Sequence, residues 1–585
     1  MIDILIVGAG PSGLCAAKTF LQYNTHADIV LVDTHATPGG VWSQEQLYPT
    51  LKTNNLFSSL DFTDFPMEAS RFGVRGPEEH IPGAVMHAYL AAYAEHFSIT
   101  PRIRFNTHVV EIRRRAGKDG WDVETTSTTT DGQTTVLSCR RLVVATGVLS
   151  VPHLPTIQGA EDFDGPIIHS SELGPKADAV FHSPKIKTVA VLGGCKSAYD
   201  AVYLAATTGH KVEWIIRKSG RGPTWVFPTH TYLGPFRAWR EKLVTRRVIS
   251  LMSPWVWPDL SGFGWLRGFL HDNRVGRFIK DKFWAAIHAD TVRDCQYRTD
   301  DRLGVLEPEQ SPYWYGTASG VLNYDTAFHA LITSNQVRIH RADISHLTPH
   351  HIHLTSTPLP IHVDALIAST GYSSKPTITF SPPTLHSALG VPTTALSKPQ
   401  RNLWATLTTE ADAQIAQTHP SLLRGPPAFN PGAPAEIAYT PWRLYRGIAP
   451  PGLTAEGDRS LVFIGMFSNI ANTLRLEMQC LWALAYFEGT SMPNVERDVS
   501  QGRVYAEAAL LQRFAQLRAP YGHGRLYPDL VFDQLPYWDG LLADVGVETR
   551  RKGAWWRELV EPYGQGDYVG VVAEWIEKAK GQGRV

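Results

Sequence analysis

A glycine-rich turn between an apolar strand and a helix of small residues is the feature that most restricts the fold of this chain. Residues Ile2 to Val7 predict a strand, which stops at Gly8-Ala9-Gly10-Pro11-Ser12-Gly13 and leads into Leu14-Cys15-Ala16-Ala17. Gly8 permits a tight turn, Gly10 lets backbone amides approach a pyrophosphate, and Gly13 lets the helix pack closely on the strand. The pattern predicts a Rossmann-like βαβ unit, and a βαβ unit without a ligand is the alternative.

An acidic residue at the end of the next strand favours nucleotide binding. The apolar residues Ile29-Val30-Leu31-Val32 end in Asp33, about 20 residues beyond the last glycine, where an acid would bind the ribose hydroxyls of a cofactor. The helix N-terminus carries roughly half a positive charge that favours phosphates. We therefore expect contacts to this first nucleotide from Gly8, Gly10, Pro11, Ser12, Gly13 and Asp33.

The same logic repeats in the middle of the chain. The segment Thr188-Val189-Ala190-Val191-Leu192 leads into Gly193-Gly194-Cys195-Lys196-Ser197-Ala198, and a strand ends at Ile216. The position of the acid is taken by Arg217 and Lys218, with Arg221 close behind, and these cations would neutralise a 2′-phosphate. The second site therefore favours NADPH over NADH, and a solvated strand end is the alternative for the cations.

This second turn departs from the usual pattern at Cys195, which replaces the second glycine. Its side chain would stand where a pyrophosphate normally approaches bare backbone. We expect Gly193 to form the turn and the phosphate to lie farther out, with help from Lys196. Ser197 is expected either to contact the phosphate or to cap the helix.

Composition limits the class of protein. A chain of 585 residues is too long for one hydrophobic core, so we expect two or three domains. Its 55 basic residues balance 55 acidic ones, which disfavours nucleic-acid binding. The five cysteines occur singly, without a CxxC pair or metal-ligand spacing, which predicts no metal site and a reducing compartment.

Neither a signal peptide nor a membrane-spanning segment is predicted. The first strand begins at Ile2, and no apolar run approaches the roughly 18 residues of a transmembrane helix. We expect a cytoplasmic protein and leave peripheral membrane contact open.

Further motifs, in chain order, resemble those of flavin-containing monooxygenases, the class B flavoprotein monooxygenases. Gly39-Gly40-Val41-Trp42 resembles the GGxW flavin loop of that family, and Tyr48-Pro49-Thr50-Leu51-Lys52-Thr53-Asn54 resembles its YPxLxTN segment. The resemblance covers about residues 1 to 220 and 335 to 490. Other matching segments are Asp64-Phe65-Pro66-Met67, Leu142 to Gly147, Ala365 to Tyr372, Phe463-Ile464-Gly465-Met466 and Glu477 to Trp482.

The link between the two nucleotide units bears on the branch of the family. Phe163 to His169 matches the FxGxxxH signature, but Ser170-Ser171-Glu172-Leu173-Gly174 replaces the extension of Baeyer–Villiger relatives. The chain resembles the flavin-containing or N-hydroxylating branch, and Baeyer–Villiger oxygenation of a ketone or aldehyde stays open. His169 is expected to be either a linker histidine or a nicotinamide contact. The second glycine turn is similar to oxygenases of fungal secondary metabolism.

The resemblance implies an FAD- and NADPH-dependent monooxygenase that inserts one atom of O2 into a substrate through a C4a-(hydro)peroxyflavin. Asn54 matches the active-site asparagine of the family, whose amide can hydrogen-bond the flavin peroxide or its substrate. A turn-forming asparagine is the alternative for Asn54, and Asn55 could be the turn residue instead. Further cofactor contacts are expected from Gly40, Val41, Trp42, Thr53, Asn54, Val109, Thr146, Gly147, Thr370, Gly371 and Met466.

We expect an α/β protein with two Rossmann-like dinucleotide-binding domains. Residues 1–165 begin the FAD domain, residues 166–372 form the NADPH domain with a mostly helical insertion at about 225–300, and residues 373–585 complete the FAD domain. The insertion is rich in tryptophan, which predicts a small satellite core with a basic rim, a substrate channel and membrane contact being the alternatives. The proline-rich residues 381–460 predict a long loop or lid, and those after 500 predict packed helices and turns.

Three other functions compete with oxygenation. A thiol–disulfide reductase shares the fold, but it needs a redox-active cysteine pair that the sequence lacks. A non-catalytic binding scaffold and an uncoupled NADPH oxidase also fit the fold. The abundant aromatic residues favour a lipophilic small-molecule substrate, but they do not distinguish a ketone from an amine, a sulfide or an activated carbon.

Overall fold

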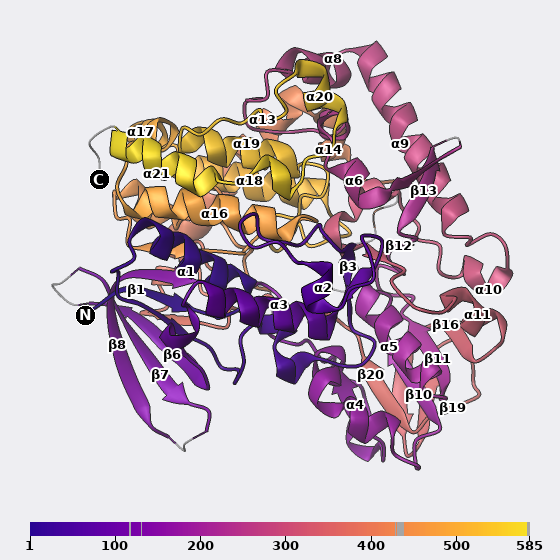
Figure 1. Cartoon of the computed structure of the whole chain (residues 1–585). Coiled ribbons are helices and arrows are strands. Elements are labelled where there is room, and N and C mark those ends of the chain that lie inside the picture. Colours follow the sequence, from indigo (N-terminus) through magenta and orange to yellow (C-terminus); the bar gives the residue numbers. More distant parts are fainter. Residues whose placement is uncertain (116–118, 130–131, 234, 428, 430–437, 582–585) are drawn as a thin grey trace.

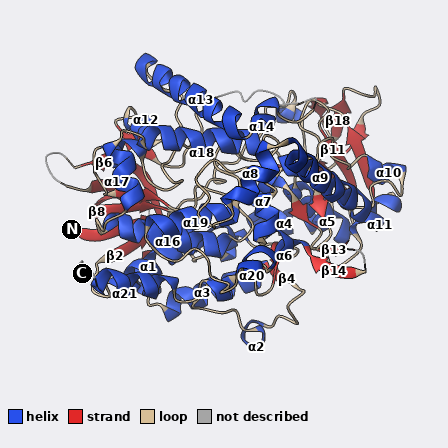
Figure 2. Ribbon diagram, turned by 90° about the horizontal axis from the view of Figure 1, so that it is seen from above, coloured by secondary structure: helices blue, strands red, loops and turns tan. Residues whose placement is uncertain are grey.

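Two separate sheets organise the chain in the computed structural model, which describes residues 1–585 except 116–118, 130–131, 234, 428, 430–437 and 582–585. The sheets lie at the lower left and lower right of Figure 1, with a helical layer above them. Seen from above in Figure 2, they lie at opposite ends of the molecule, with helices between them. The predicted α/β class with two Rossmann-like cores is confirmed.

The first sheet has the strand order β21-β6-β7-β8-β1-β2-β5, and β22 pairs with β8. Its parallel centre consists of fully or largely apolar strands, because helices cover their faces. Helix α1 (Pro11–Tyr23) packs against α16 (Asn472–Phe487). The strands are β1 (Ile2–Val7), β2 (Ile29–Val32), β5 (Ile103–Arg104), β6 (Thr107–Arg114), β7 (Trp121–Ser127), β8 (Thr134–Val144), β21 (Thr379–Ser381) and β22 (Leu461–Phe463).

The second sheet is entirely parallel, in the order β16-β11-β10-β20-β9. Because the strand order reverses direction beside β10, a crevice is expected at the carboxyl ends of these strands. Helices α4 (Leu173–Phe181) and α5 (Lys196–Thr207) belong to this half. The strands are β9 (Ile167–His169), β10 (Thr188–Leu192), β11 (Lys211–Ile216), β16 (Val337–Arg341) and β20 (Ala365–Ala368).

The C-terminal segment completes the core of the first half. Helices α18 (Val504–Arg518), α19 (Gln534–Asp544) and α21 (Val571–Gly581) share one hydrophobic cluster with α1 and α16. Arg446 is buried here and its Nε donates to Asp544 at 2.8 Å, which compensates two charges removed from water. The expectation of packed helices and turns after residue 500 is confirmed.

The insertion begins with strands and continues as helices. A hairpin of β13 (His230–Leu233) and β14 (Phe236–Trp239) follows β12 (Val226–Phe227), which pairs with β15 (Gly320–Val321). The helices are α6 (Arg240–Val244), α7 (Arg247–Leu251), α8 (Gly264–Asp272), α9 (Arg274–Asp294) and α10 (Asp301–Gly304). The insertion is therefore mostly helical, as expected.

The satellite core predicted for the insertion is much smaller than expected. Trp255 and Trp257 join the core of the first half, and Trp225 joins that of the second. Within the described part of the insertion, Leu251, Phe263 and Leu270 form a small buried cluster of their own. The prediction failed because large indole rings are buried most completely where two larger layers meet.

Exposed apolar side chains gather on α8, α9 and α20 (Trp555–Val560), at the top right of Figure 1. Trp265 is 73% exposed, Phe278 62% and Trp555 71%. Among the residues described, no helix combines the length and apolar character needed to cross a bilayer. Peripheral membrane contact stays a prediction for this face.

The prediction of a long loop or lid at residues 381–460 is wrong for about half of the described residues in that stretch, which are helical. It contains α12 (Leu385–Leu389), the 21-residue α13 (Lys398–Thr418), α14 (Pro420–Arg424) and α15 (Pro451–Ala455), while 428 and 430–437 lie outside the described residues. Prolines stand in the first turns of α13, α14 and α15, where a missing N–H costs nothing, so they start helices rather than prevent them.

Candidate functional site

The first glycine turn requires glycine at two positions for steric reasons. Gly8 has φ +110°, and a Cβ there would stand 2.6 Å from the carbonyl oxygen of Ala145. A Cβ on Gly13 would stand 1.9 Å from the carbonyl oxygen of Gly8. The strand, the turn and α1 therefore pack at a distance that side chains would prevent.

Two further segments meet this turn. The amide of Gly39 donates to the carbonyl oxygen of Ala9 at 2.9 Å, and a Cβ on Gly40 would stand 3.1 Å from Cα of Gly10. From the other side, a Cβ on Gly465 would stand 2.5 Å from Oγ of Ser12. The predicted flavin loop and the closing strand thus converge on the N-terminus of α1, which starts at Pro11.

Asp33 directly follows β2 and hydrogen-bonds the glycine turn. Its Oδ2 accepts from the amide of Ala9 at 2.6 Å, and its Oδ1 accepts from the amide and the ring Nδ1 of His35 at 2.9 and 3.0 Å. This contact raises the pKa of His35. Each carboxylate oxygen can accept more than one hydrogen bond, so the predicted ribose contact remains compatible with this geometry.

Several buried polar groups around the same turn lack a partner within the described residues. They are Oγ of Ser43, both amide atoms of Asn469, Oγ1 of Thr473, and Nε and Nη1 of Arg475. Burial lowers the pKa of the Arg475 guanidinium to about 10. Unpaired buried donors are costly, and the phosphates, ribityl hydroxyls and ring carbonyls of FAD are suitable partners. These residues fit FAD, and the sequence reasoning missed them.

Asn54 lies in strand β3 (Lys52–Leu56), not in a turn. Its side chain is exposed and forms no hydrogen bond with the described residues. The alternative of a turn-forming asparagine is therefore wrong for both Asn54 and Asn55. Thr53 is buried, and its hydroxyl donates to the carbonyl oxygen of Asn55 at 2.7 Å and accepts from the amide of Ile81 at 3.0 Å.

Asn55 is instead buried against the insertion. Its Nδ2 donates to Oε1 of Glu241 at 2.5 Å and to the carbonyl oxygen of Ile470 at 3.2 Å. The amide of Leu56 donates to Oε2 of Glu241 at 3.2 Å, and burial raises the pKa of Glu241. Glu241 was not foreseen, because a single glutamate in an unmatched insertion gives no sequence signal of its distant contact.

The remaining predicted contacts to the first nucleotide lie at the edges of this region. Val41 is 66% exposed on the flavin loop, and Trp42 is tied through its carbonyl oxygen to Nδ1 of His87 at 3.1 Å. The side chains of Val109 and Met466 are buried in the core, so the contacts predicted for these two residues could come only from their backbone groups.

The second turn also requires glycine. Gly193 has φ +139°, and a Cβ there would stand 2.2 Å from the carbonyl oxygen of Ser369. Cys195 is the N-cap residue of α5, and its thiol donates to that carbonyl at 3.4 Å. The thiol thus points toward the residue that follows β20, and it also faces the backbone amides of Ser197 and Ala198. The capping role considered for Ser197 is wrong, because Ser197 lies inside the first turn and forms no cap hydrogen bond.

Lys196, predicted to help with the phosphate, has partners within the chain. Its ammonium contacts Asp200 and donates to Oδ1 of Asn323 at 3.0 Å and to the hydroxyl of Tyr324 at 3.2 Å. The charge is therefore already compensated, and the phosphate contact stays a prediction.

Arg217 and Lys218 directly follow β11, with Lys218 exposed. Arg341 ends the neighbouring strand β16, where it pairs with Ile216, and a Cβ on Gly222 would stand 3.4 Å from its guanidinium nitrogens. Arg221 turns away, since its Nη1 donates to the carbonyl oxygens of Tyr521 and Gly522. Arg341 is thus an additional candidate for the 2′-phosphate, and it lies too far along the chain for the sequence pattern to reveal it.

The chain crosses between the two halves at Thr146–Gly147 and at Thr370–Gly371. His169, at the end of β9, contacts the second crossing, because its Nε2 donates to the carbonyl oxygen of Gly371 at 2.9 Å while its Nδ1 accepts from the amide of Ser171 at 3.1 Å. Both ring nitrogens are engaged and burial lowers the pKa of His169, which supports the linker role. The hydroxyl of Thr370 donates to the carbonyl oxygen of His153.

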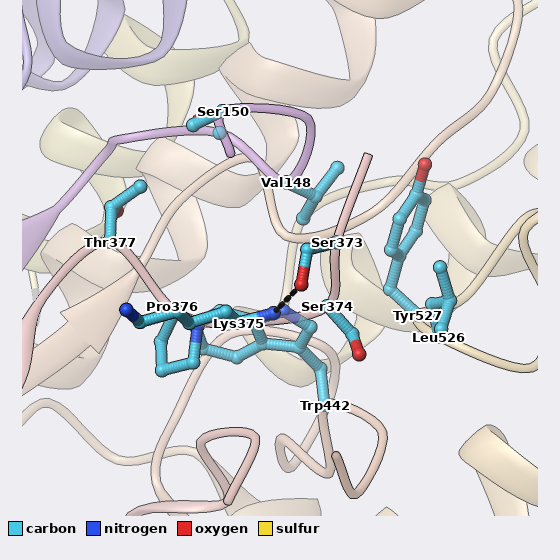
Figure 3. Close-up of a pocket in the computed structure, with 11 residues that line it drawn as sticks. Val148, Ser150, Ser373, Ser374, Lys375, Pro376, Thr377, Trp442, Leu526 and Tyr527 are labelled. Carbon is cyan, nitrogen blue, oxygen red and sulfur yellow. Dashed lines mark hydrogen bonds between the residues drawn. The ribbon is translucent and has the colours of Figure 1, made fainter. Parts of the chain in front are cut away.

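A small pocket opens where the two crossings meet the C-terminal segment (Figure 3). Gly147, Val148 and Ser150 come from the first crossing and Ser373 to Thr377 from the second. Trp442, Leu526 and Tyr527 complete its wall. The predicted Gly147 therefore lies at a junction of all three parts of the chain.

Two cysteines that are far apart in sequence are neighbours in the structure. Cys15 on α1 and Cys480 on α16 are both fully buried, and each thiol lies close enough to influence the other. Burial raises the pKa of Cys15 well above its usual value, which suppresses the thiolate that disulfide exchange requires. This pair does not have the properties of a redox-active dithiol.

Comparison with known proteins identifies the family. A family model described as pyridine nucleotide-disulphide oxidoreductase matches residues 5–230. FAD-dependent monooxygenase resA of Aspergillus sclerotiorum is 32% identical over 98% of each chain. An FAD-dependent monooxygenase of Pyrenophora dematioidea is 33% identical over 94% of this chain and 99% of its own.

This chain belongs to the FAD-dependent monooxygenases. Solved structures of similar fold include an oxidized steroid monooxygenase bound to NADP, at TM-score 0.58 and 17% identity over 94% of this chain and 98% of that one. Cyclohexanone monooxygenase from Rhodococcus sp. Phi1 bound to NADP+ matches at TM-score 0.55 and 16% identity, over 93% and 97%. At these low sequence identities, the solved structures show only that this monooxygenase shares their fold.

Proposed function

We propose that this FAD-dependent monooxygenase takes its electrons from NADPH and transfers one oxygen atom of O2 to a lipophilic small molecule. The observation that carries the NADPH assignment is the pair of arginines, Arg217 and Arg341, at the ends of adjacent strands beside the second glycine turn. Two cations at this point suit a 2′-phosphate and leave the hydroxyl of NADH without a matching acceptor. The NADP in solved structures of this fold supports the assignment.

In this proposal, the first turn and the loops that meet it hold FAD. The backbone amides of Gly10, Ser12 and Gly13 would donate to the pyrophosphate, and Asp33 would bind the ribose. Ser43, Asn469, Thr473 and Arg475 supply the polar contacts that are unpaired within the described residues. Bound FAD supplies hydride acceptance and oxygen activation, which no side chain can provide. The protein contributes binding, orientation and exclusion of water.

Asn54 is the proposed catalytic residue. It is the exposed position of β3, between two neighbours whose side chains are buried. Its amide can both donate to and accept from a reacting oxygen or a substrate group. Because the strand backbone around it is fixed by hydrogen bonds, the amide is presented without a large ordering cost.

The experiment compares NADPH with NADH in anaerobic reduction of the purified flavoprotein, followed by turnover under 18O2 with ketone, amine and sulfide substrates. We expect NADPH to bleach the flavin absorbance with a KM about tenfold or more below that of NADH, and one 18O atom to enter the product. Preference for NADH would contradict the cation assignment. Complete recovery of the electrons as hydrogen peroxide with every substrate would indicate an oxidase instead.

A further inference from the structure

Side chains from two other parts of the chain hold β3, the strand that carries Asn54, on both flanks. Nδ2 of Asn323 donates to the carbonyl oxygens of Lys52 and Thr53 at 3.2 and 3.0 Å. On the far side of Asn54, Glu241 accepts from Asn55 and Leu56. Asn323 also contacts a residue of the second nucleotide turn.

Asn323 is held in turn by Lys196. The ammonium of Lys196 donates to Oδ1 of Asn323 at 3.0 Å, and Asn323 is only 5% exposed. An ammonium can only donate, so this contact fixes the orientation of the amide: its oxygen faces Lys196 and its NH2 group faces β3. The carbonyl oxygens of Lys52 and Thr53 can only accept, so they favour the same orientation of the amide from the other side.

The path of the Lys196 side chain is fixed by its surroundings. Its methylene groups lie against Gly320, where a Cβ would stand 2.7 Å from Cδ of Lys196. The ammonium lies 4.7 Å from the centre of the Tyr324 ring and contacts Asp200. With a side chain only 14% exposed and a carboxylate partner, Lys196 is directed toward Asn323.

We propose that Lys196 and Asn323 are positioning residues for Asn54. Lys196 is the first residue of α5, at the predicted NADPH turn. Asn323, which Lys196 orients, donates hydrogen bonds to the two residues that precede Asn54. The pair therefore couples the second nucleotide turn to the flavin strand. This inference rests on the proposed function, because it assumes NADPH at α5 and a role for Asn54 beside the flavin.

The test uses K196M, N323A, N323D and the double variant K196M/N323A in the FAD-loaded protein. N323D is the matched variant, because a carboxylate keeps an acceptor for Lys196 but loses the donor to Lys52 and Thr53. Four measurements are made: the Kd of NADP+ by titration of the flavin absorbance, the amplitude of the NADP+-induced spectral change, product formed per NADPH consumed, and Tm. K196R, which keeps a cationic donor, tests rescue.

We expect K196M to bind NADP+ within about threefold of wild type, since its charge is compensated internally. K196M, N323A and N323D should each lose most of the spectral change and lower product per NADPH about tenfold. The double variant should be no worse than either single one, because both remove the same link. K196R should recover part of the spectral change.

Three results would overturn the inference. Loss of NADP+ affinity by tenfold or more in K196M, with N323A unaffected, would make Lys196 a phosphate ligand. Additive losses in the double variant would mean that the two residues act separately. A lowered Tm in all variants with unchanged spectral change and coupling would mean a purely structural contact. These three results are distinguishable from a failure of the proposed function, because in that case the wild-type protein would show no flavin reduction by NADPH.

Discussion

Arg341 is the register partner of Ile216, so the last residue of β16 stands beside the last residue of β11. Arg217 follows Ile216 directly, and the two guanidinium groups therefore extend from the same edge of the second sheet. Parallel strands bring their carboxyl ends together at one edge, where α/β folds bind nucleotides. This register is the basis of the proposal that Arg217 and Arg341 bind the 2′-phosphate of NADPH.

We expect Arg217→Ala and Arg341→Ala each to weaken NADPH binding by roughly 10- to 100-fold, the loss of one charge-assisted hydrogen bond. The affinity for NADH should change little, because it has no 2′-phosphate. Isothermal titration with both dinucleotides measures this. Arg338→Ala is the control, since Arg338 is an exposed arginine on the same strand, before its end. Equal losses for both dinucleotides would remove the assignment.

Neighbouring asparagines on β3 should behave differently. Asn54→Ala should leave Tm unchanged, because the Asn54 side chain is exposed and forms no hydrogen bond within the described structure. One hydrogen bond in the site has an effect of roughly tenfold, so its loss should divert about 90% or more of the electrons to hydrogen peroxide. Asn55→Ala should lower stability by about 1–3 kcal/mol, because it removes the side-chain donor to Oε1 of the buried Glu241 and leaves the carboxylate only the Leu56 amide of β3. Thermal unfolding and peroxide assays measure both, and a Tm loss in Asn54→Ala would argue for a structural role.

Substitutions at two glycines of the first turn should affect different properties, one the stability of the fold and the other the binding of FAD. Gly13→Ala places a Cβ 1.9 Å from a backbone oxygen, so we expect a loss of about 3 kcal/mol in the free energy of unfolding. At Gly10 the nearest atom to a Cβ is 3.5 Å away, an ordinary contact. Gly10→Ala should therefore fold normally but bind FAD more weakly, since the methyl group covers the backbone that approaches the pyrophosphate. A Gly10→Ala protein purified with a full complement of FAD would contradict this.

Glu477 should make stability depend on pH. Burial raises its pKa from 4.5 to about 8, although its side chain accepts from the amide and hydroxyl of Thr63. A carboxyl whose pKa rises on folding contributes its full stability below the unfolded value of 4.5 and loses it as the pH rises through about 8. The Tm of Glu477→Gln should therefore increase relative to wild type over this range. Glu95→Gln, at an exposed site on α3 (Gly83–His96), should show no such trend.

Local spacing was sufficient for the nucleotide units. The turns at Gly8 and Gly193 are read from sequence because the strand, turn and helix of a βαβ unit are contiguous, and each part has its own residue preference. The order of the flavin motifs also pointed to the monooxygenase family. The prolines between 381 and 460 led to the wrong prediction of a loop. Proline breaks a helix when it stands in the interior but is favoured in the first turn, and only its position in the helix distinguishes these effects.

The sequence by itself determined the two dinucleotide folds and the monooxygenase family, and Arg217 in it predicts a preference for NADPH. Only the tertiary structure decided which distant groups surround those residues. Glu241, Asn323, Arg341 and Arg475 lie far from the motifs in the chain, and their contacts depend on strand register, on the packing of the insertion and on the closing helix α16. A side chain's partner across such separations is set by three-dimensional packing, which leaves no periodic signal in the sequence.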